Sequence, residues 1–452
     1  MKLENRTWIR YYKEGRFSKS ITFKKAEAEM LRTKTFLNNN GITKGDVVIV
    51  KTPNSINAVI LYMTLLKNEI VYIPVSPMIL KNKLDFIIRD SGAKAIIEND
   101  KIIHLDQKRR KVLQGISTII YTSGTTGDPK GVCLSYRNWK NNSRALRKHH
   151  QFNDKTVLLT PLPLFHVNAH GLAMITSYIC KSRLILLDKY DENILKIINK
   201  EHVTVASFVP VILDKLLEKN SKFHFNKKFK YFITAAAPLK GSLLRRIQEN
   251  WKTYVVQGYG LSESTNFSCS LPNNLSITEY SKVMFPHPSI GIELPGVKIK
   301  FKNSKNNEGE LQVKSNSNSI KYLGKSLRKI PWINTGDIGY AKKINGKKYF
   351  YLTGRKKELI NRGGEKLSPI ELEEELINNG LKGEFAIISI SDEKFGEDVG
   401  LVSTRRINNK ILKNIPYYRR PKKIIMLKAL PYTASGKIQR KNLSELINKN
   451  GI

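Results

Sequence analysis

Short hydrophobic runs alternate with longer amphipathic segments through the first two thirds of the chain. The run VVIV at 47–50 is typical of a buried strand, the following INAVILYMTLLKN of a helix, and VYIPVS of a second strand. Strand–helix pairs of the same kind recur at 183–200, 204–219 and 230–251. Because such alternation produces parallel sheets covered by helices, the pattern predicts a large α/β domain with parallel-rich sheets. Ligands of these folds bind at the carboxyl ends of the strands.

The pattern changes after residue 285. The runs VKIKFKN, GELQVKS and KKYFYLTGR are typical of antiparallel strands, which we expect to form a small β-barrel-like part. A polar connector, TGRKKELINRGGEKLSP, leads to the amphipathic IELEEELINNG and to the strand-like FAIISIS and KKIIMLK. The chain is therefore predicted to have a large N-terminal domain, residues 1–354, and a small mobile α+β C-terminal domain, residues 355–452.

The chain is strongly basic. Its 78 lysines and arginines exceed its 38 aspartates and glutamates, so the formal net charge is +40 over 452 residues. Such a charge favours anionic partners, among them nucleic acid, a membrane surface or a nucleotide. However, lysine is spread along the chain, and no single block carries the excess of positive charge. No aromatic–basic nucleic-acid-binding module is present. We therefore attribute the charge to general composition and expect no nucleic-acid partner.

Cysteine spacing and hydropathy argue against several protein classes. The three cysteines, Cys133, Cys180 and Cys269, are far apart and form no CxxC pair, so neither a disulfide framework nor a zinc knuckle is expected. The segment MKLENRTWIRYYKEGRFS lacks the apolar core of a signal peptide. The longest apolar stretch, near AVILYMTLL, is about half as long as a membrane span. We expect a cytoplasmic protein without a transmembrane segment.

The stretch YTSGTTGDPKGVCLS, from Tyr121 to Ser135, crowds hydroxyl groups, glycines and a lysine behind the strand-like STII. It is not a Walker loop, because Lys130 stands between Pro129 and Gly131, where that helix would have to begin. Its hydroxyls, glycines and lysine could still hold phosphate in another way. Taken alone, these residues leave a flexible surface loop as the alternative.

Several separated segments resemble one family, in the same order. SGTTGDPKGV resembles the signature loop of the adenylate-forming (AMP-binding) superfamily, which includes acyl- and aryl-CoA synthetases. The resemblance continues in PLPLFH (161–166), TAAAPL (234–239), QGYGLSES (257–264), NTGD (334–337), TGRKKELINRGGEKLSPIELE (353–373) and PYTASGKIQR (431–440). It spans nearly the whole chain.

The resemblance implies an ATP-dependent, AMP-forming acid–thiol ligase acting on a small-molecule carboxylic acid. Such an enzyme activates the acid as an acyl-adenylate and then transfers the acyl group to the thiol of CoA. The alternatives are a stand-alone enzyme that loads the phosphopantetheine of an acyl carrier protein, and a non-catalytic nucleotide-binding homologue. Lys437, Glu263 and Asp337 are all present, which argues against the non-catalytic homologue. The implied cofactors are ATP, Mg²⁺ and CoA, or the carrier's phosphopantetheine in place of CoA.

The resemblance also implies roles for single residues. Lys437 is expected to reach from the C-terminal domain to the carboxylate and the α-phosphate, since a point charge suits charge spread over several oxygens. Glu263 is expected to ligate Mg²⁺, a hard cation that prefers oxygen. Lys357 is expected to be the hinge about which the small domain rotates before the thiol step, and Gly363 and Gly364 to help form the tunnel for the thiol.

The nucleotide-binding set that the resemblance implies is larger. Asp337 would accept hydrogen bonds from the ribose hydroxyls, with Arg355 beside it, and Tyr259 would lie against the adenine. The other expected contacts come from the phosphate loop, the adenine-side turn, the segment around Tyr259 and the hinge: Thr122, Ser123, Gly124, Thr125, Thr126, Gly127, Lys130, Ala235, Ala236, Ala237, Pro238, Gly258, Gly260, Ser262 and Lys357.

His166 is expected at the mouth of the acyl pocket as a catalytic-site residue, because PLPLFH resembles the family's segment beside that pocket. His166 and His170 have the spacing of metal ligands, but no glutamate follows His166 as HExxH requires, and zinc is not expected. Amino-acid-activating relatives typically carry an aspartate where this chain has His166, which argues for an acid without an α-amino group. Apolar or small neighbours suggest an acyl or aryl tail: Phe208, Val209, Ala235 and Ala236.

Overall fold

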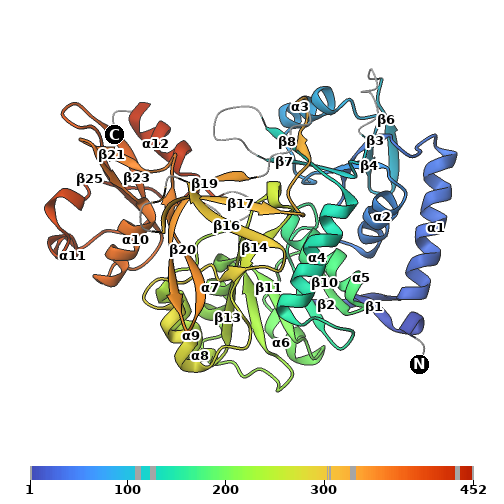
Figure 1. The fold of residues 1–452 in the computed structure, drawn as a ribbon, viewed down its shortest axis with the longest axis horizontal. Coiled ribbons are helices and arrows are strands. Elements are labelled where there is room, and N and C mark those ends of the chain that lie inside the picture. Colours follow the sequence, from blue (N-terminus) through green and yellow to red (C-terminus); the bar gives the residue numbers. More distant parts are fainter. Residues whose placement is uncertain are drawn as a thin grey trace.

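The computed structural model describes residues 3–106, 114–122, 129–302, 304, 307–325, 332–432 and 438–449. The described strands form a seven-stranded, a nine-stranded and a five-stranded sheet. In Figure 1 the first lies near the N-terminal helices, the second in the centre, and the third, with its own helices, at the C-terminal end. A four-stranded antiparallel sheet lies between the central part and the C-terminal part. This layered arrangement is the α/β architecture that the strand–helix alternation predicts.

The seven-stranded sheet mixes parallel and antiparallel strands. In spatial order its strands are β18 (Lys321–Tyr322), β8 (Lys130–Leu134), β7 (Thr118–Thr122), β4 (Val71–Pro74), β3 (Val47–Lys51), β5 (Ala95–Glu98) and β6 (Lys101–His104). The inner strands β7, β4, β3 and β5 are parallel, whereas β8, β18 and β6 run antiparallel to their neighbours. The antiparallel strand β8 therefore brings the chain straight back from the end of β7.

The nine-stranded sheet holds most of the predicted strand–helix pairs. In spatial order its strands are β15 (Ile292–Glu293), β14 (Phe267–Ser270), β13 (Tyr254–Gly260), β12 (Tyr231–Thr234), β11 (Val205–Phe208), β9 (Val157–Thr160), β10 (Arg183–Leu187), β1 (Thr7–Lys13) and β2 (Arg16–Thr22). The strands from β13 to β1 are parallel. The hairpin β1–β2 was not predicted, because its only local signal is the short run WIRYY; it extends the edge of the sheet far from its neighbours in sequence.

The helices begin and end where local chemistry favours it. Ser135 starts a helix through a reciprocal cap with Asn138, and Gly92 ends one in the left-handed conformation at φ 61°. The helices are α1 (Phe23–Asn39), α2 (Ile56–Lys67), α3 (Lys81–Ser91), α4 (Tyr136–His150), α5 (Thr176–Cys180), α6 (Ile194–Lys200), α7 (Pro210–Lys219), α8 (Gly241–Trp251), α9 (Ile277–Met284), α10 (Pro369–Asn378), α11 (Asn409–Lys413) and α12 (Arg440–Lys449). Shorter helical turns are η1 (Leu3–Asn5), η2 (Ala169–Ile175), η3 (Ser262–Ser264) and η4 (Tyr417–Arg419).

The last third of the chain changes to antiparallel pairing, as predicted. The four-stranded sheet has the order β16 (Val297–Lys302), β17 (Glu308–Ser315), β19 (Ile333–Ile344) and β20 (Lys347–Arg355). The five-stranded sheet contains β22 (Glu365–Leu367), β21 (Ile360–Arg362), β24 (Gly396–Ser403) and β23 (Phe385–Asp392), with β25 (Lys423–Met426) parallel to β24.

The C-terminal sheet is buried on both faces. Phe385 and Ile387 of β23 belong to a cluster with residues of α10, while Ala386 and Ile388 between them belong to a cluster with residues of α12. This two-sided burial explains why the strand reads as an almost continuous apolar run rather than as an alternating one. The C-terminal part therefore has hydrophobic clusters of its own; the domain boundary at 354/355 stays a prediction.

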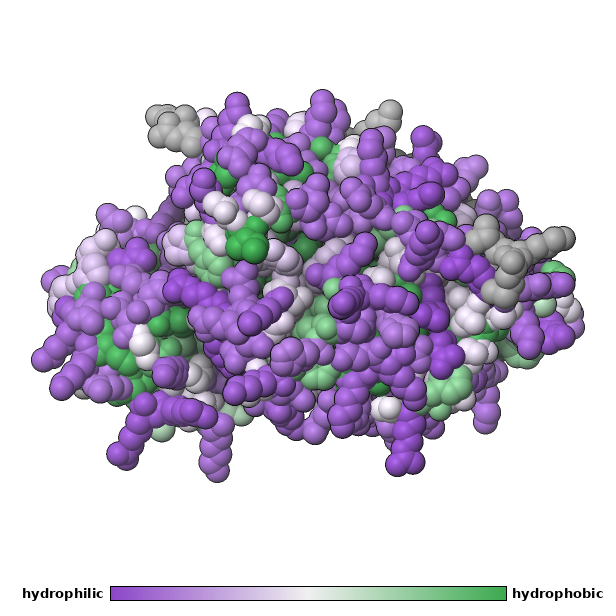
Figure 2. Space-filling model, turned by 90° about the horizontal axis from the view of Figure 1, so that it is seen from below, coloured by the Kyte–Doolittle hydropathy of each residue, from purple (hydrophilic) through white to green (hydrophobic). Residues whose placement is uncertain are grey.

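The surface is predominantly hydrophilic on the face seen in Figure 2, where apolar side chains form small, scattered patches. Cys133, Cys180 and Cys269 are all buried and free. Over the described ranges of the chain, no helix combines the length and the apolar character needed to cross a membrane.

Candidate active site

The two ends of the predicted phosphate loop lie side by side. Strands β7 and β8 pair antiparallel, with Thr122 opposite Lys130, and the Thr122 hydroxyl donates to the Lys130 carbonyl at 3.4 Å. The chain therefore returns as a strand where a Walker loop would continue as a helix, in agreement with the sequence argument. The predicted contacts between these ends lie outside the described residues: Ser123, Gly124, Thr125, Thr126 and Gly127.

Three predicted nucleotide-binding residues meet in one buried network. Oδ2 of Asp337, on β19, accepts from the Tyr259 hydroxyl at 2.7 Å, and Oδ1 accepts from Arg355 Nε at 2.7 Å. Asp337 is only 5% exposed. Burial and the Asp337 carboxylate raise the pKa of Tyr259 well above its ordinary value, so the phenol stays a donor at neutral pH. A carboxylate held on both sides in this way has a fixed orientation and keeps lone pairs for further donors.

The adenine-side turn TAAAPL departs from ordinary backbone geometry. Ala235 is buried just beyond β12, whereas Ala236 and Pro238 are exposed and Ala237 is partly exposed. Ala236 has φ 71°, the left-handed region, which costs a residue with a Cβ roughly 1–2 kcal/mol. Backbone strain of this kind persists only where the surrounding structure enforces it, and strained residues are often found at functional sites.

Glu263 lies in η3, directly after β13 and the predicted contacts Gly258, Gly260 and Ser262. Its Oε1 accepts from the Tyr322 hydroxyl at 2.9 Å, and its backbone carbonyl accepts from Ser319 N at 2.6 Å. Among the residues that the structure describes, no donor contacts Oε2. A Cβ on Gly260 would lie 1.7 Å from the Asn266 carbonyl oxygen, so the chain can fold back behind Glu263 only with a glycine there.

This carboxylate suits Mg²⁺. Proteins usually hold Mg²⁺ with one or two carboxylates together with substrate phosphates, rather than with a cage of protein ligands. A partly exposed carboxylate with one oxygen fixed and the other open meets that description. In the described part of the chain, no three acidic, histidine or cysteine side chains are grouped closely enough to hold a metal ion.

Buried polar side chains hydrogen-bond to the backbone of the segment PLPLFH. Asn54 Nδ2 donates to the Leu162 carbonyl at 3.0 Å, and Asn54 Oδ1 accepts from Leu164 N at 2.8 Å. His170 Nδ1 lies 3.0 Å from the Leu164 carbonyl, and its Nε2 lies 2.6 Å from the Tyr72 hydroxyl. Both ring nitrogens of His170 are therefore hydrogen-bonded: Nδ1 carries the proton and donates to Leu164, and Nε2 accepts from Tyr72.

His166 itself closes the segment. Its backbone nitrogen donates to the Pro163 carbonyl at 3.0 Å, and its ring lies 4.5 Å from the ring of Phe165, centroid to centroid. Phe208, one of the expected acyl-pocket neighbours, is fully buried and packs against Phe232 of the same sheet.

The hinge region is a polar turn. Lys357 is exposed, and the backbone nitrogens of Glu358 and Leu359 donate to the Arg355 carbonyl at 2.9 and 3.1 Å. Gly363 and Gly364 have φ values of 56° and 97° in the turn between β21 and β22. Lys437 lies outside the described residues.

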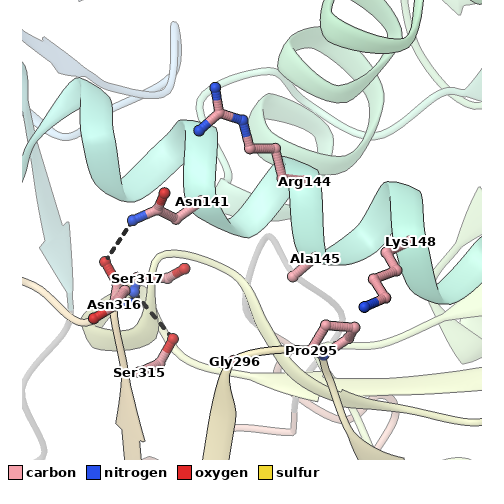
Figure 3. A pocket seen from close by; sticks show the side chains of 9 residues that line it. All are labelled: Asn141, Arg144, Ala145, Lys148, Pro295, Gly296, Ser315, Asn316 and Ser317. Atoms are coloured by element: carbon pink, nitrogen blue, oxygen red, sulfur yellow. Dashed lines mark hydrogen bonds between the residues drawn. The ribbon is translucent and has the colours of Figure 1, made fainter.

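A pocket of about 230 Å³ lies between α4, the residues just before β16 and the end of β17 (Figure 3). Lys148 points toward Pro295, whereas Arg144 points away from Ser315. The pocket contains none of the predicted site residues, and we assign it no part in the chemistry. Its lining residues are Asn141, Arg144, Ala145, Lys148, Pro295, Gly296, Ser315, Asn316 and Ser317.

Comparison with known proteins decides the family. The AMP-binding enzyme family matches residues 4–118 and 113–323, more than half of the chain. The chain belongs to the AMP-binding enzyme family. Similar proteins include oxalate–CoA ligase of Arabidopsis thaliana, 26% identical over 90% of this chain and 89% of that protein, and 2-succinylbenzoate–CoA ligase of Bacillus anthracis (strain A0248), 29% identical over 75% of this chain and 71% of that protein.

Solved structures share the whole fold of this AMP-binding enzyme. ATP-bound MatB from Rhodopseudomonas palustris superimposes with a TM-score of 0.84 at 23% identity, over 100% of this chain and 97% of that one. The o-succinylbenzoate CoA synthetase of Bacillus subtilis, in complex with its acyl-adenylate intermediate, gives 0.83 at 22% identity, over 97% and 95%. The same synthetase is also known with ATP and magnesium ion, at 23% identity. The predictions of family, fold class and ligase class are confirmed, and the expected cofactors agree with these relatives.

Sequence reasoning missed the groups that support the site of this AMP-binding enzyme. Tyr322, which holds Glu263, lies in the short run KYLG, where a tyrosine has no local signature of function. Asn54 and Tyr72 follow or lie within N-terminal strands and act on a segment 90 or more residues away. Their role depends on contacts between distant elements, which no local pattern reports.

Proposed function

We propose that this AMP-binding enzyme is an acid–thiol ligase that makes an acyl- or aryl-CoA from a carboxylic acid, ATP and CoA. The observation that carries the proposal is the buried Asp337 carboxylate, fixed between Tyr259 and Arg355. A carboxylate in this arrangement can accept from two neighbouring ribose hydroxyls, as expected from its position in NTGD. The names of the relatives, CoA ligases of oxalate and of 2-succinylbenzoate, support the same class of reaction.

The first half-reaction needs charge to be neutralised at the phosphates. An oxygen of the acid attacks the α-phosphorus, the bond from that phosphorus to the bridging oxygen breaks, and pyrophosphate leaves. Thr122 and Lys130, which are paired on adjacent strands at the two ends of the loop, would contact the leaving phosphates. Glu263 would hold Mg²⁺ through Oε2, and the bound ion would neutralise charge that develops on the phosphate oxygens.

Lys437 completes this step in our proposal. Its ammonium group would contact both the carboxylate of the acid and the α-phosphate oxygens, which lowers the cost of bringing two anions together. Arg440, three residues further on, is anchored in the C-terminal part, because its Nη2 contacts Glu373 Oε1 of α10 at 2.7 Å. Arg440 is thus a fixed point close in sequence to Lys437.

The second half-reaction needs access for a thiol. The thiol sulfur attacks the acyl carbon, and the bond from that carbon to the AMP oxygen breaks, so AMP leaves with the electron pair. Rotation of residues 355–452 about Lys357 would remove Lys437 and bring Gly363 and Gly364 to the path of the thiol. We favour CoA as the acceptor, since the relatives are CoA ligases.

The acid is proposed to lack an α-amino group. By its place in PLPLFH, His166 would stand where amino-acid-activating relatives carry an aspartate for the ammonium group. The segment before it is held by Asn54 and His170. A histidine at this place accommodates a neutral or anionic part of the substrate.

One screen tests the proposal. Pyrophosphate release is measured over a panel of carboxylic and amino acids, each with CoA, with a phosphopantetheinylated carrier protein, and with neither. We expect acid-dependent release for carboxylic acids and a thioester product only with CoA. A thioester only on the carrier protein would favour the carrier-loading alternative. Absence of release with every acid, in a protein that binds ATP, would contradict the proposed reaction.

A further inference from the structure

Glu263 is tied to a tyrosine 59 residues further along the chain. The Tyr322 hydroxyl donates to Glu263 Oε1 at 2.9 Å, and Ser319 N donates to the Glu263 backbone carbonyl at 2.6 Å. Thr265, just beyond, donates its hydroxyl to the Ser317 carbonyl. Three contacts thus attach η3 and the following Thr265 to one short segment, 317–322, and two of them fix the backbone and the side chain of Glu263.

The segment 317–322 and the preceding Asn316 are hydrogen-bonded to α4. Asn138, in the first turn of α4, donates to the carbonyls of Asn316 and Asn318 at 3.2 and 2.9 Å. Asn141, one turn further on, donates to the Asn316 carbonyl at 3.2 Å, which Figure 3 shows. These side-chain amides satisfy backbone carbonyls that, in an irregular segment, have no backbone hydrogen-bond partner from a helix or a sheet. Tyr322 therefore projects from a fixed base.

The same segment is joined to the strand that follows the phosphate loop. β18 pairs antiparallel with β8, with Tyr322 opposite Val132, and Leu323 N donates to the Gly131 carbonyl at 2.7 Å. Strand β8 begins at Lys130. β18 therefore joins Tyr322, which contacts the Glu263 carboxylate, to the strand that begins at Lys130.

Tyr322 has the donor state that this contact needs. The Tyr322 hydroxyl is the donor in this contact, since an ionised carboxylate can only accept. With Oε1 engaged by that proton, Oε2 has no donor among the described residues and is the oxygen left for a cation. The position of Tyr322 is set by β18, and the tyrosine would not need to contact the substrate.

We propose that Tyr322 is a positioning residue for the divalent cation: its hydroxyl holds Glu263 Oε1 so that Oε2 stays available to the metal of bound ATP. This inference rests on the proposed function, because it takes Glu263 as the metal ligand. Outer partners of metal-binding carboxylates typically change metal affinity by roughly 10–100-fold when they are removed.

The test measures metal binding without turnover. Free Mn²⁺ is followed by electron paramagnetic resonance as it is titrated into the protein with saturating ATP and no carboxylic acid. ATP affinity is measured separately in EDTA. For Tyr322→Phe we expect about 10-fold weaker Mn²⁺ binding to the protein–ATP complex, with metal-free ATP affinity changed less than about twofold. Glu263→Gln is the reference variant and should lose at least as much.

Tyr351→Phe is the matched control. It removes a buried hydroxyl that donates to the Val283 carbonyl at 3.2 Å, away from Glu263, and should leave Mn²⁺ affinity unchanged. Unaltered Mn²⁺ affinity in Tyr322→Phe, beside a loss in Glu263→Gln, would overturn the role of Tyr322 alone. An equal loss of metal-dependent and metal-free ATP binding in Tyr322→Phe would also overturn it, since that is the result of general loosening. Failure of the unaltered protein to bind ATP would overturn the proposed function and this inference together.

Discussion

The Tyr259 hydroxyl and Asp337 Oδ2 form a buried hydrogen bond of 2.7 Å that joins β13 to β19. The two residues are 78 positions apart in the chain, and the other oxygen of Asp337 is held by Arg355 across the pair of strands β19 and β20. The contact brings the nine-stranded and the four-stranded sheets together at a carboxylate.

Asp337→Asn is expected to weaken ATP binding roughly 10–100-fold, because a charge-assisted hydrogen bond is worth about 1.5–3 kcal/mol and the amide cannot accept at both atoms. Isothermal titration calorimetry with ATP measures the change. Asp214→Asn, which removes an exposed partner of Arg246, is the control and should bind ATP normally. Normal ATP affinity in Asp337→Asn would argue against a ribose contact.

Lys437→Ala is expected to lose acyl-adenylate formation by orders of magnitude, while still making thioester from supplied acyl-AMP. The reason is that the ammonium group is needed only where the two anions react. ATP–pyrophosphate exchange reports the first step and thioester formation the second. Lys428→Ala changes an exposed lysine of the same C-terminal part and should retain both. Persisting exchange in Lys437→Ala would show that another group carries the charge.

Lys357→Pro is expected to slow the thiol step and leave adenylation unchanged. Proline restricts φ, and a hinge must change its backbone angles between the two half-reactions. Lys357→Ala removes the same side chain without restricting the backbone and should keep both rates. If the two variants lose both partial reactions equally, Lys357 is not the hinge.

The buried His170 predicts loss of stability in acid. Burial lowers the pKa of His170 from 6.5 to about 4, so the unfolded state binds a proton more readily than the folded state. The contribution is complete above pH 6.5 and is lost as the pH falls toward 4. Between pH 7 and pH 5 this one group should remove about 2 kcal/mol of unfolding free energy.

Urea unfolding at both pH values, in the unaltered protein and in His170→Gln, isolates this term. Burial also lowers the pKa values of His149 and His150, so the unaltered protein should lose more than His170 accounts for. The difference in pH dependence between the two proteins, rather than their stability at pH 7, is the measurement. His224→Gln, at an exposed histidine, should behave like the unaltered protein. An identical pH dependence in His170→Gln would contradict a lowered pKa at His170.

Much of the architecture was predictable because each buried element has a local pattern. The helix α2 and the strands β3 and β4 follow directly from INAVILYMTLLKN, VVIV and VYIPVS, since burial on all sides requires continuous apolar runs. The hairpin β1–β2 was missed because an edge pair is stabilised by a neighbour more than 170 residues away, as in the pairing of Ile9 with Leu184.

The sequence by itself determined the order of the motifs, the charged residues and the glycines that allow close backbone approach, because the expected phosphate loop and metal carboxylate need those residue types in short stretches. Only the tertiary structure decided which groups orient the Glu263 side chain and which groups hold the segment before His166 in place. Those tasks belong to Tyr322 and to the pair Tyr72–His170, whose partners are 59 and 98 residues away. Such contacts depend on how strands are paired and helices are packed, and a single hydroxyl that reaches across a sheet leaves no periodic trace in the chain.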